Sequence, residues 1–256
     1  MGLNYNKIFN IPARSLNEVK ITKAFFLSSF DLTTTDKNVL NYEIQSMHWL
    51  ASIKPSNANI SAEVNDMYNY EEIQVMLCTL KGLGLQQFGD KCVQLFQKYI
   101  PYPILLIIED EDNFMINTCD KRINQNDTTK RTIEKHISTP ILTKLYKDDL
   151  VSALFDGLNY TALDKTNLET VYKSYVKAIV NYQTALVTGA TLVRKHTRTE
   201  DDMQMLEQIR KLEKEVSRLS TQIKKESQFN TKLNLNVDIQ KYRKEIESIK
   251  NKLGQE

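Results

Sequence analysis

The stretch from Thr199 to Leu253 most constrains how this chain can fold, because it contains neither Gly nor Pro. Nothing in it therefore forces a helix to end. Thr199, followed three residues later by Asp202, is a typical helix start. Apolar residues then recur at alternating steps of four and three, with Lys, Arg, Glu, Gln and Ser between them, which is the pattern of a coiled coil.

These apolar residues form two seams that are out of phase with each other. The first comprises Met205, Ile209, Leu212, Val216, Leu219 and Ile223, and the second comprises Leu235, Ile239, Tyr242, Ile246, Ile249 and Leu253. Residues 224–234 break the pattern, which is compatible with a continuous helix about 80 Å long or with an antiparallel hairpin that reverses near residues 228–230. The lack of Gly at the break favours the continuous helix. Its seam would need a partner, either a second copy or another protein, whereas a hairpin would cover its own seam.

Upstream of this stretch the hydrophobic period changes. Residues 72–81 predict a strand, residues 85–100 a helix, residues 104–108 a buried strand, and residues 114–119 the returning arm of a hairpin, with a further strand at 132–137. The expected fold is α+β: a small two-layer α/β domain followed by helices and a long C-terminal coiled-coil helix or helical hairpin. The expected parts are 1–140 for the α/β domain, 141–195 for a helical segment and 196–256 for the coiled coil.

The first 54 residues are expected to be mainly helical. One helix is predicted at residues 22–30. A second begins at Thr35 and carries Val39, Leu40, Ile44 and Met47 at helical spacing, continuing toward Pro55. Further on, residues 148–158 and 166–188 also have helical patterns.

Composition excludes several classes of protein. The hydrophobic fraction of 41% and the net charge of +2 are those of an ordinary globular chain, without a global attraction to nucleic acid or acidic membranes. No apolar run approaches 18 residues, so no membrane partner is expected. Three widely spaced Cys with no Cys-x-x-Cys pair are expected to be reduced core residues of a cytoplasmic protein.

Carboxylates near the first strand raise the question of a metal site. Glu71 and Glu72 precede that strand and Lys81 ends it, which resembles part of a metal-dependent nuclease constellation. Thr79 occupies the position where such a strand would carry its central carboxylate. Mg²⁺ is therefore expected only under a nuclease alternative, and no other cofactor is predicted. The acidic run Glu109–Asp112 is interpreted as a solvated hairpin tip, since consecutive ligands diverge there.

Two polar segments could contact nucleic acid. Lys121 and Arg122 could hold phosphate, while Asn124 and Gln125 could recognise polar groups. Arg194 and Lys195 form a second basic cluster just before the predicted coiled coil. The alternative interpretation is a loop whose Asn and Asp side chains cap its own backbone, and a hinge whose charges are only solvated.

Three runs in the chain resemble a bacterial family known as domain of unknown function 4391. They are Ile100–Ile108, Lys121–Gln125 and Lys225–Asn236. Members of that family look like companions of helicase and DNA methyltransferase genes in restriction-like or antiphage clusters. The resemblance implies a role near DNA, and it supplies no catalytic residue that could be carried over.

The expected function is that of a non-catalytic accessory or assembly subunit that acts through its coiled coil. Its partner would be a second copy or a larger helicase- or methyltransferase-type protein in a DNA-related antiviral system. The alternatives are a divergent metal-dependent nuclease and a DNA-binding module. The long seam and the incomplete catalytic set favour the first of these.

Overall fold

The computed structural model describes residues 3–128, 130–145, 148–190 and 198–255. These residues fall into two compact units, Met1–Ile179 and Val180–Glu256, which are described separately. The predicted mixed α/β class is confirmed, with a mixed sheet and C-terminal helices. Among the described residues, no helix combines the length and the apolar character that crossing a membrane requires.

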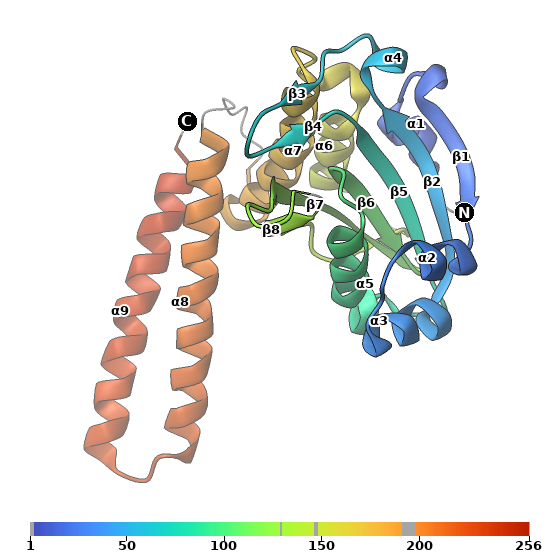
Figure 1. Ribbon diagram of the computed structural model, residues 1–256. Helices are drawn as coiled ribbons and strands as arrows, with labels where there is room; N and C mark the ends of the chain where they lie inside the picture. Colours follow the sequence, from blue (N-terminus) through green and yellow to red (C-terminus); the bar gives the residue numbers. More distant parts are fainter. Residues whose placement is uncertain (1–2, 129, 146–147, 191–197, 256) are drawn as a thin grey trace. The chain divides into compact units, whose positions relative to one another are not determined.

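The first unit is built around strands and short helices that alternate along the chain (Figure 1). Its strands are β1 (Leu16–Ile21), β2 (Ile44–Ile53), β3 (Glu63–Val64), β4 (Asn69–Tyr70), β5 (Ile73–Leu80), β6 (Ile104–Glu109), β7 (Asn113–Ile123), β8 (Arg131–Ser138) and β9 (Leu142–Thr143). Its helical elements are α1 (Tyr5–Phe9), η1 (Ala13–Ser15), α2 (Lys23–Ser29), α3 (Thr34–Asn38), η2 (Val39–Glu43), α4 (Pro55–Ala58), α5 (Leu85–Tyr99), α6 (Asp149–Leu158), η3 (Tyr160–Ala162) and the first part of α7 (Leu168–Thr188).

Seven of the strands form one mixed sheet in the order β1-β2-β5-β6-β7-β8, with β9 paired to β7. Every pairing is antiparallel except β5 with β6, which run parallel and are joined by α5. A parallel pair needs such a crossover, because a tight turn can only reverse the chain. The predicted strand–helix–strand–hairpin order of residues 72–119 is confirmed.

The predicted helix from Thr35 to Ile53 is wrong beyond Glu43. Residues Ile44–Ile53 form β2, which pairs with both β1 and β5. The apolar residues Met47, Trp49, Ala51 and Ile53 also alternate with a period of two, so this segment fits both spacings. Pairing with two neighbouring strands decides between them, since tertiary contacts override a weak local preference. Strand β1 was also not predicted.

Helices cover both faces of the sheet, which explains why β6 is apolar from Ile104 to Ile108 (Figure 1). Met115 contacts Gly89 of α5, whereas the neighbouring Phe114 ring packs against Phe155 of α6. Because successive residues of a strand point to opposite faces, α5 and α6 lie on opposite sides of β7. Residues Ile104–Ile108 are fully buried between these layers, as a strand with no wet face requires.

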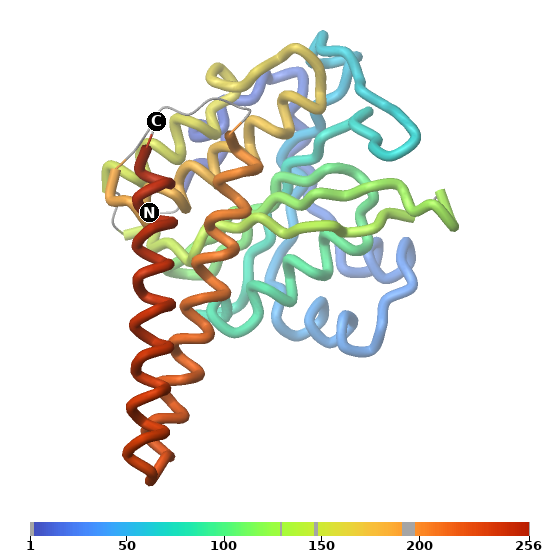
Figure 2. Tube along the Cα trace, turned by 90° about the vertical axis from the view of Figure 1, so that its left-hand side faces the viewer, coloured from blue at the N-terminus to red at the C-terminus, as the bar shows by residue number. Residues whose placement is uncertain are grey.

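The second unit contains a helical hairpin rather than one long helix. Helices α8 (Thr199–Lys225) and α9 (Phe229–Leu253) run side by side and antiparallel (Figure 1, Figure 2). The favoured continuous helix is therefore wrong, and the hairpin alternative is confirmed. Every residue of the two predicted seams is buried or half-buried. The seam thus no longer requires a partner chain.

The turn of the hairpin forms without Gly because its residues keep extended backbone angles. Glu226 and Gln228 have φ of −75° and −80°, so neither residue adopts the left-handed conformation that favours Gly. The Glu226 carboxylate accepts hydrogen bonds from the backbone N–H groups of Ser227 at 2.7 Å and Gln228 at 2.9 Å. These two bonds lower the pKa of Glu226. The Glu226 carboxylate therefore stabilises a turn that was expected to need a Gly.

Candidate functional site

The carboxyl ends of the parallel strands β5 and β6 bring several polar side chains together. In open α/β sheets this edge is where ligands usually bind. Glu109 ends β6, and Thr79 lies beside it in register on β5. Tyr5 of α1 and Lys144, just after β9, reach the same carboxylate from segments more than a hundred residues apart in sequence.

The Glu109 carboxylate is almost completely enclosed and fully paired. Its Oε2 atom accepts a hydrogen bond from the Tyr5 hydroxyl at 2.8 Å and lies 2.9 Å from Lys144 Nζ. Its Oε1 atom accepts a longer bond from Thr79 Oγ1 at 3.4 Å. The side chains of Lys144 and Glu109 are only 9% and 14% exposed. Burial, and secondarily the negative charge of Glu109, raise the pKa of Tyr5 far above its ordinary value, so its phenol stays neutral.

The next residue, Asp110, corrects the expectation of a solvated acidic tip. It is 2% exposed, and its Oδ2 accepts a hydrogen bond from the N–H of Leu85 at the start of α5. Its Oδ1 accepts the N–H groups of Asp112 and Asn113, and its carbonyl accepts Lys144 Nζ at 2.6 Å. A carboxylate at a helix N-terminus is favoured by the helix dipole. The acidic run therefore contains one buried and one half-buried structural carboxylate, both of which sequence reasoning missed.

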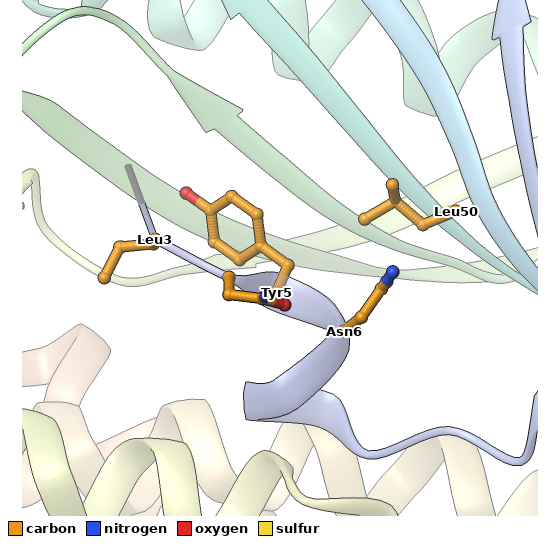
Figure 3. Close-up of a pocket in the computed structure, with 5 residues that line it drawn as sticks. Leu3, Tyr5, Asn6 and Leu50 are labelled. Atoms are coloured by element: carbon orange, nitrogen blue, oxygen red, sulfur yellow. The ribbon is translucent and has the colours of Figure 1, made fainter. Parts of the chain in front are cut away.

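A pocket of about 330 Å³ lies beside Tyr5 and is lined by Leu3, Asn4, Tyr5, Asn6 and Leu50 (Figure 3). Its polar groups are engaged with neighbours of their own chain. The Tyr5 hydroxyl points to Glu109, Asn4 Oδ1 caps the N–H of Lys7, and Asn6 Nδ2 donates to Glu18. The arrangement ties the N-terminal segment to the sheet. It presents neither an activated nucleophile nor a base poised to act on a ligand in this pocket.

The two carboxylates predicted for a metal are not assembled with further ligands. Glu72 accepts a hydrogen bond from Ser52 Oγ at 2.7 Å. In the part of the chain that the structure describes, no three His, Cys, Asp or Glu side chains converge as a metal site would require. Glu72 and Lys81 also stand at opposite ends of β5, roughly 30 Å apart at the usual strand rise. Lys81 therefore cannot act beside an ion held by Glu71 and Glu72, as the nuclease alternative requires.

Of the residues predicted to contact nucleic acid, Arg122, Asn124 and Gln125 are described on the surface, and each contacts its own chain. Arg122 pairs with Glu134 at 3.0 Å. Asn124 Oδ1 caps the N–H groups of Asn126 and Asp127, and Gln125 Nε2 reaches the carbonyl of Ile123. This matches the alternative in which the loop binds its own backbone. Arg194 and Lys195 lie outside the described residues, so their DNA contact stays a prediction.

Lys121 is buried rather than presented to a phosphate. Its Nζ donates to the carbonyls of Ile100 at 2.8 Å and Tyr102 at 3.0 Å, just beyond the end of α5. Burial lowers the pKa of Lys121 to about 7, with a smaller contribution from the nearby Arg131 charge. Burial, and then the charge of Lys121, also lower the pKa of His136. Lys121 thus fixes the loop after α5 by satisfying carbonyls that the helix end leaves open.

The outer face of α9 carries a feature that the seam pattern hid. Phe229, Leu233 and Val237 are 76%, 54% and 61% exposed, and they follow one another at intervals of four residues. On the opposite side of the same helix, Ile239, Ile246 and Ile249 are buried. We call Phe229, Leu233 and Val237 the outer stripe. Their regular spacing was visible in the sequence, but only the hairpin shows that they face away from α8.

Comparison with known proteins identifies a family. The sequence profile described as "Domain of unknown function (DUF4391)" matches residues 9–246. Neither the curated proteins nor the solved structures contain a match. The profile covers both units described above, including the sheet, α5, α7 and most of the hairpin. This chain therefore belongs to the DUF4391 family.

Proposed function

We propose that the chain is a non-catalytic assembly subunit, which binds a partner protein through the outer face of its C-terminal hairpin. The observation that carries this proposal is the outer stripe of Phe229, Leu233 and Val237. Large apolar side chains scattered singly on a surface are normal, whereas a contiguous exposed set marks an interaction site. Here three stand in a row on a helix whose other face is already packed.

The first unit supports the non-catalytic part of the proposal. In its polar cluster around Glu109, the side-chain polar atoms of Glu109, Tyr5, Thr79 and Lys144 are each paired with another part of the chain. A catalytic site needs groups whose protons or lone pairs remain available to a substrate. The Glu109 cluster instead joins the N-terminal segment, the sheet and the segment after β9, which suits a rigid scaffold.

The resemblance noted from the sequence suggests where to look for the partner. It points to a larger helicase- or methyltransferase-type protein in a DNA-related bacterial defence system, in the cytoplasm. The three reduced and buried cysteines agree with a reducing compartment. No cofactor is part of the proposal.

The test compares two triple variants of the tagged full-length chain, purified from its own cell. In the first, Phe229, Leu233 and Val237 are each replaced by Ser. The matched control replaces Gln204, Lys214 and Gln222, which are exposed on α8, by Ser. We expect one or more proteins to co-purify in stoichiometric amount with the wild type and the control and to be lost from the stripe variant. Retention of the same partners by the stripe variant, with unchanged helix content by circular dichroism, would contradict the proposal.

A further inference from the structure

The half of the hairpin next to its turn differs from the rest in charge as well as in apolar surface. Residues 224–244 contain six basic side chains and two acidic ones, for a net charge of +4. The basic ones are Lys224, Lys225, Lys232, Lys241, Arg243 and Lys244, and the acidic ones are Glu226 and Asp238. Residues 199–223, by contrast, carry four basic and six acidic side chains, for a net charge of −2. The outer stripe therefore lies within the only strongly basic part of the hairpin that is described.

The shape of the outer stripe suits a helix. Residues four apart form the ridges that interlock when two helices pack. Phe229, Leu233 and Val237 are one such ridge, about 12 Å long at the rise of an α-helix. Asn230 and Asn236 flank it and are exposed. They provide the polar rim that usually surrounds the apolar centre of an interface.

A second copy of the chain is a poor occupant of this ridge. In a two-fold symmetric pairing, the basic segment 224–244 of one copy would meet the same segment of the other, each with a net charge of +4. Like charges repel, and a two-fold interface makes each such unfavourable contact twice. The three side chains expose roughly 300 Å² in all, against about 800 Å² per partner in a stable interface. The occupant must therefore also contact the charged surface around the ridge.

A membrane surface fits less well than a protein helix. From Phe229 to Val237 the ridge turns through only about 80° around the helix. Helices that lie in a membrane interface bury a broader apolar face than this. Beyond Val237 the same side of α9 continues with Gln240 and Lys244, which are polar and exposed.

We infer that the outer stripe and the lysines around it bind an amphipathic helix of a partner protein whose polar flanks are acidic. The inference rests on the proposed function and adds the chemical class of the partner. The apolar side of the partner helix packs on Phe229, Leu233 and Val237. Its Asp and Glu side chains pair with Lys241 and Lys244, which are both exposed.

The experiment places a benzophenone-bearing phenylalanine analogue at Leu233 of the full chain in its own cell. The same analogue at Ser217, which is exposed on α8, is the control position. After irradiation, the cross-linked peptide is identified by mass spectrometry. We expect Leu233 to cross-link to a predicted helix of another protein with an excess of Asp and Glu over Lys and Arg. A cross-link to a second copy, to residues 3–179 of the same chain, to phospholipid or to a basic segment would overturn the inference.

A charge reversal then tests the acidic flanks. The double variant Lys241→Glu and Lys244→Glu should lower the yield of that cross-link about fivefold, since exposed pairs each contribute a modest amount. Arg210→Glu with Lys214→Glu, on the less basic part of α8, should leave it unchanged. Equal cross-link yields from the two double variants would overturn the inference that Lys241 and Lys244 pair with acidic side chains of the partner.

The outcomes also separate this inference from the proposed function. If Leu233 cross-links to another protein through a segment that is not an acidic helix, the inference fails while the proposed function stands. If Leu233 cross-links to no other protein, both the inference and the proposed function fail, whatever Ser217 does.

Discussion

The Glu109 cluster and the hairpin differ in how far their charged and apolar side chains are exposed to solvent. In the first unit a carboxylate and an ammonium that are only 14% and 9% exposed pair with each other. In the hairpin the ion pairs Lys211–Glu207 and Arg218–Glu215 lie at the surface, and Phe229, Leu233 and Val237 are exposed. A surface ion pair contributes little to the free energy of unfolding, whereas removing one partner of a buried pair lowers it strongly. The contacts of the first region thus hold its own chain together, whereas the second region leaves an apolar surface exposed to which another protein could bind.

The largest effect should come from breaking the buried pair. Lys144→Met removes the cation that neutralises Glu109 and also the donor to the Asp110 carbonyl. We expect the free energy of unfolding to fall by about 3 kcal/mol, because an unpaired charge remains buried. Chemical denaturation measures this change.

Two controls sharpen that prediction. Adding Glu109→Gln to Lys144→Met should restore part of the lost stability, since no unpaired charge is then left. Lys211→Met, at the exposed pair of α8, should change the free energy of unfolding by less than about 0.5 kcal/mol. Equal losses for Lys144→Met and Lys211→Met would remove the distinction between the two regions.

A second prediction compares the two faces of α9 at neighbouring positions. Ile239 is 4% exposed and Val237 is 61% exposed. Ile239→Ala should destabilise the hairpin by about 2 kcal/mol, because it removes buried methyl and methylene groups. Val237→Ala should have little effect on stability. Hydrogen exchange of the α9 amides reports the difference, and equal acceleration by the two variants would mean that the outer face is also packed.

A third prediction concerns the pH dependence that burial of Lys121 creates. Its pKa of about 7 lies below the ordinary lysine value, so between pH 7 and about 10 the unfolded chain binds more protons than the folded one. The Lys121 contribution to stability therefore increases as the pH rises through this window. Relative to Lys121→Met, the wild type should gain about 2 kcal/mol between pH 7 and pH 9. Parallel curves for the two proteins in denaturation at several pH values would show that Lys121 stays protonated.

The smallest effect is expected at the hairpin turn. Glu226→Ala removes the acceptor of the Ser227 and Gln228 N–H groups. We expect faster hydrogen exchange at those two amides, with little change along the rest of α8 and α9. Glu226→Gln keeps an acceptor oxygen and should exchange more slowly than the Ala variant. Identical exchange in all three proteins would show that the turn does not depend on this side chain.

Several elements followed from local sequence because local and tertiary preferences agree there. The apolar run Ile104–Ile108 became the buried strand β6, and α5 begins and ends within a residue of its predicted limits. The structure of residues 44–53 could not be predicted in this way, because their apolar residues fit the spacing of both a helix and a strand. Only pairing with β5 on one side and β1 on the other selected the strand.

The candidate sites were harder to predict than the fold. Glu109 and Asp110 looked like part of a solvated acidic tip, since their partners Tyr5 and Lys144 are distant in sequence. Lys121 looked like a phosphate ligand, because a sequence does not show that Ile100 and Tyr102 direct carbonyls at it. Such errors arise wherever a polar residue is satisfied by a segment far away along the chain.

The sequence by itself determined that residues 199–225 and 229–253 are helical and that their seams must be covered, because helical spacing and the absence of Gly and Pro are local properties. It also determined the strands and the helix of residues 73–119, whereas the continuation of β7 to Ile123 was not predicted. Only the tertiary structure decided that the seam is covered by the chain itself, through a turn made by extended residues and one carboxylate. For the same reason only the structure showed the outer stripe: which side of a helix remains exposed depends on where its neighbour lies.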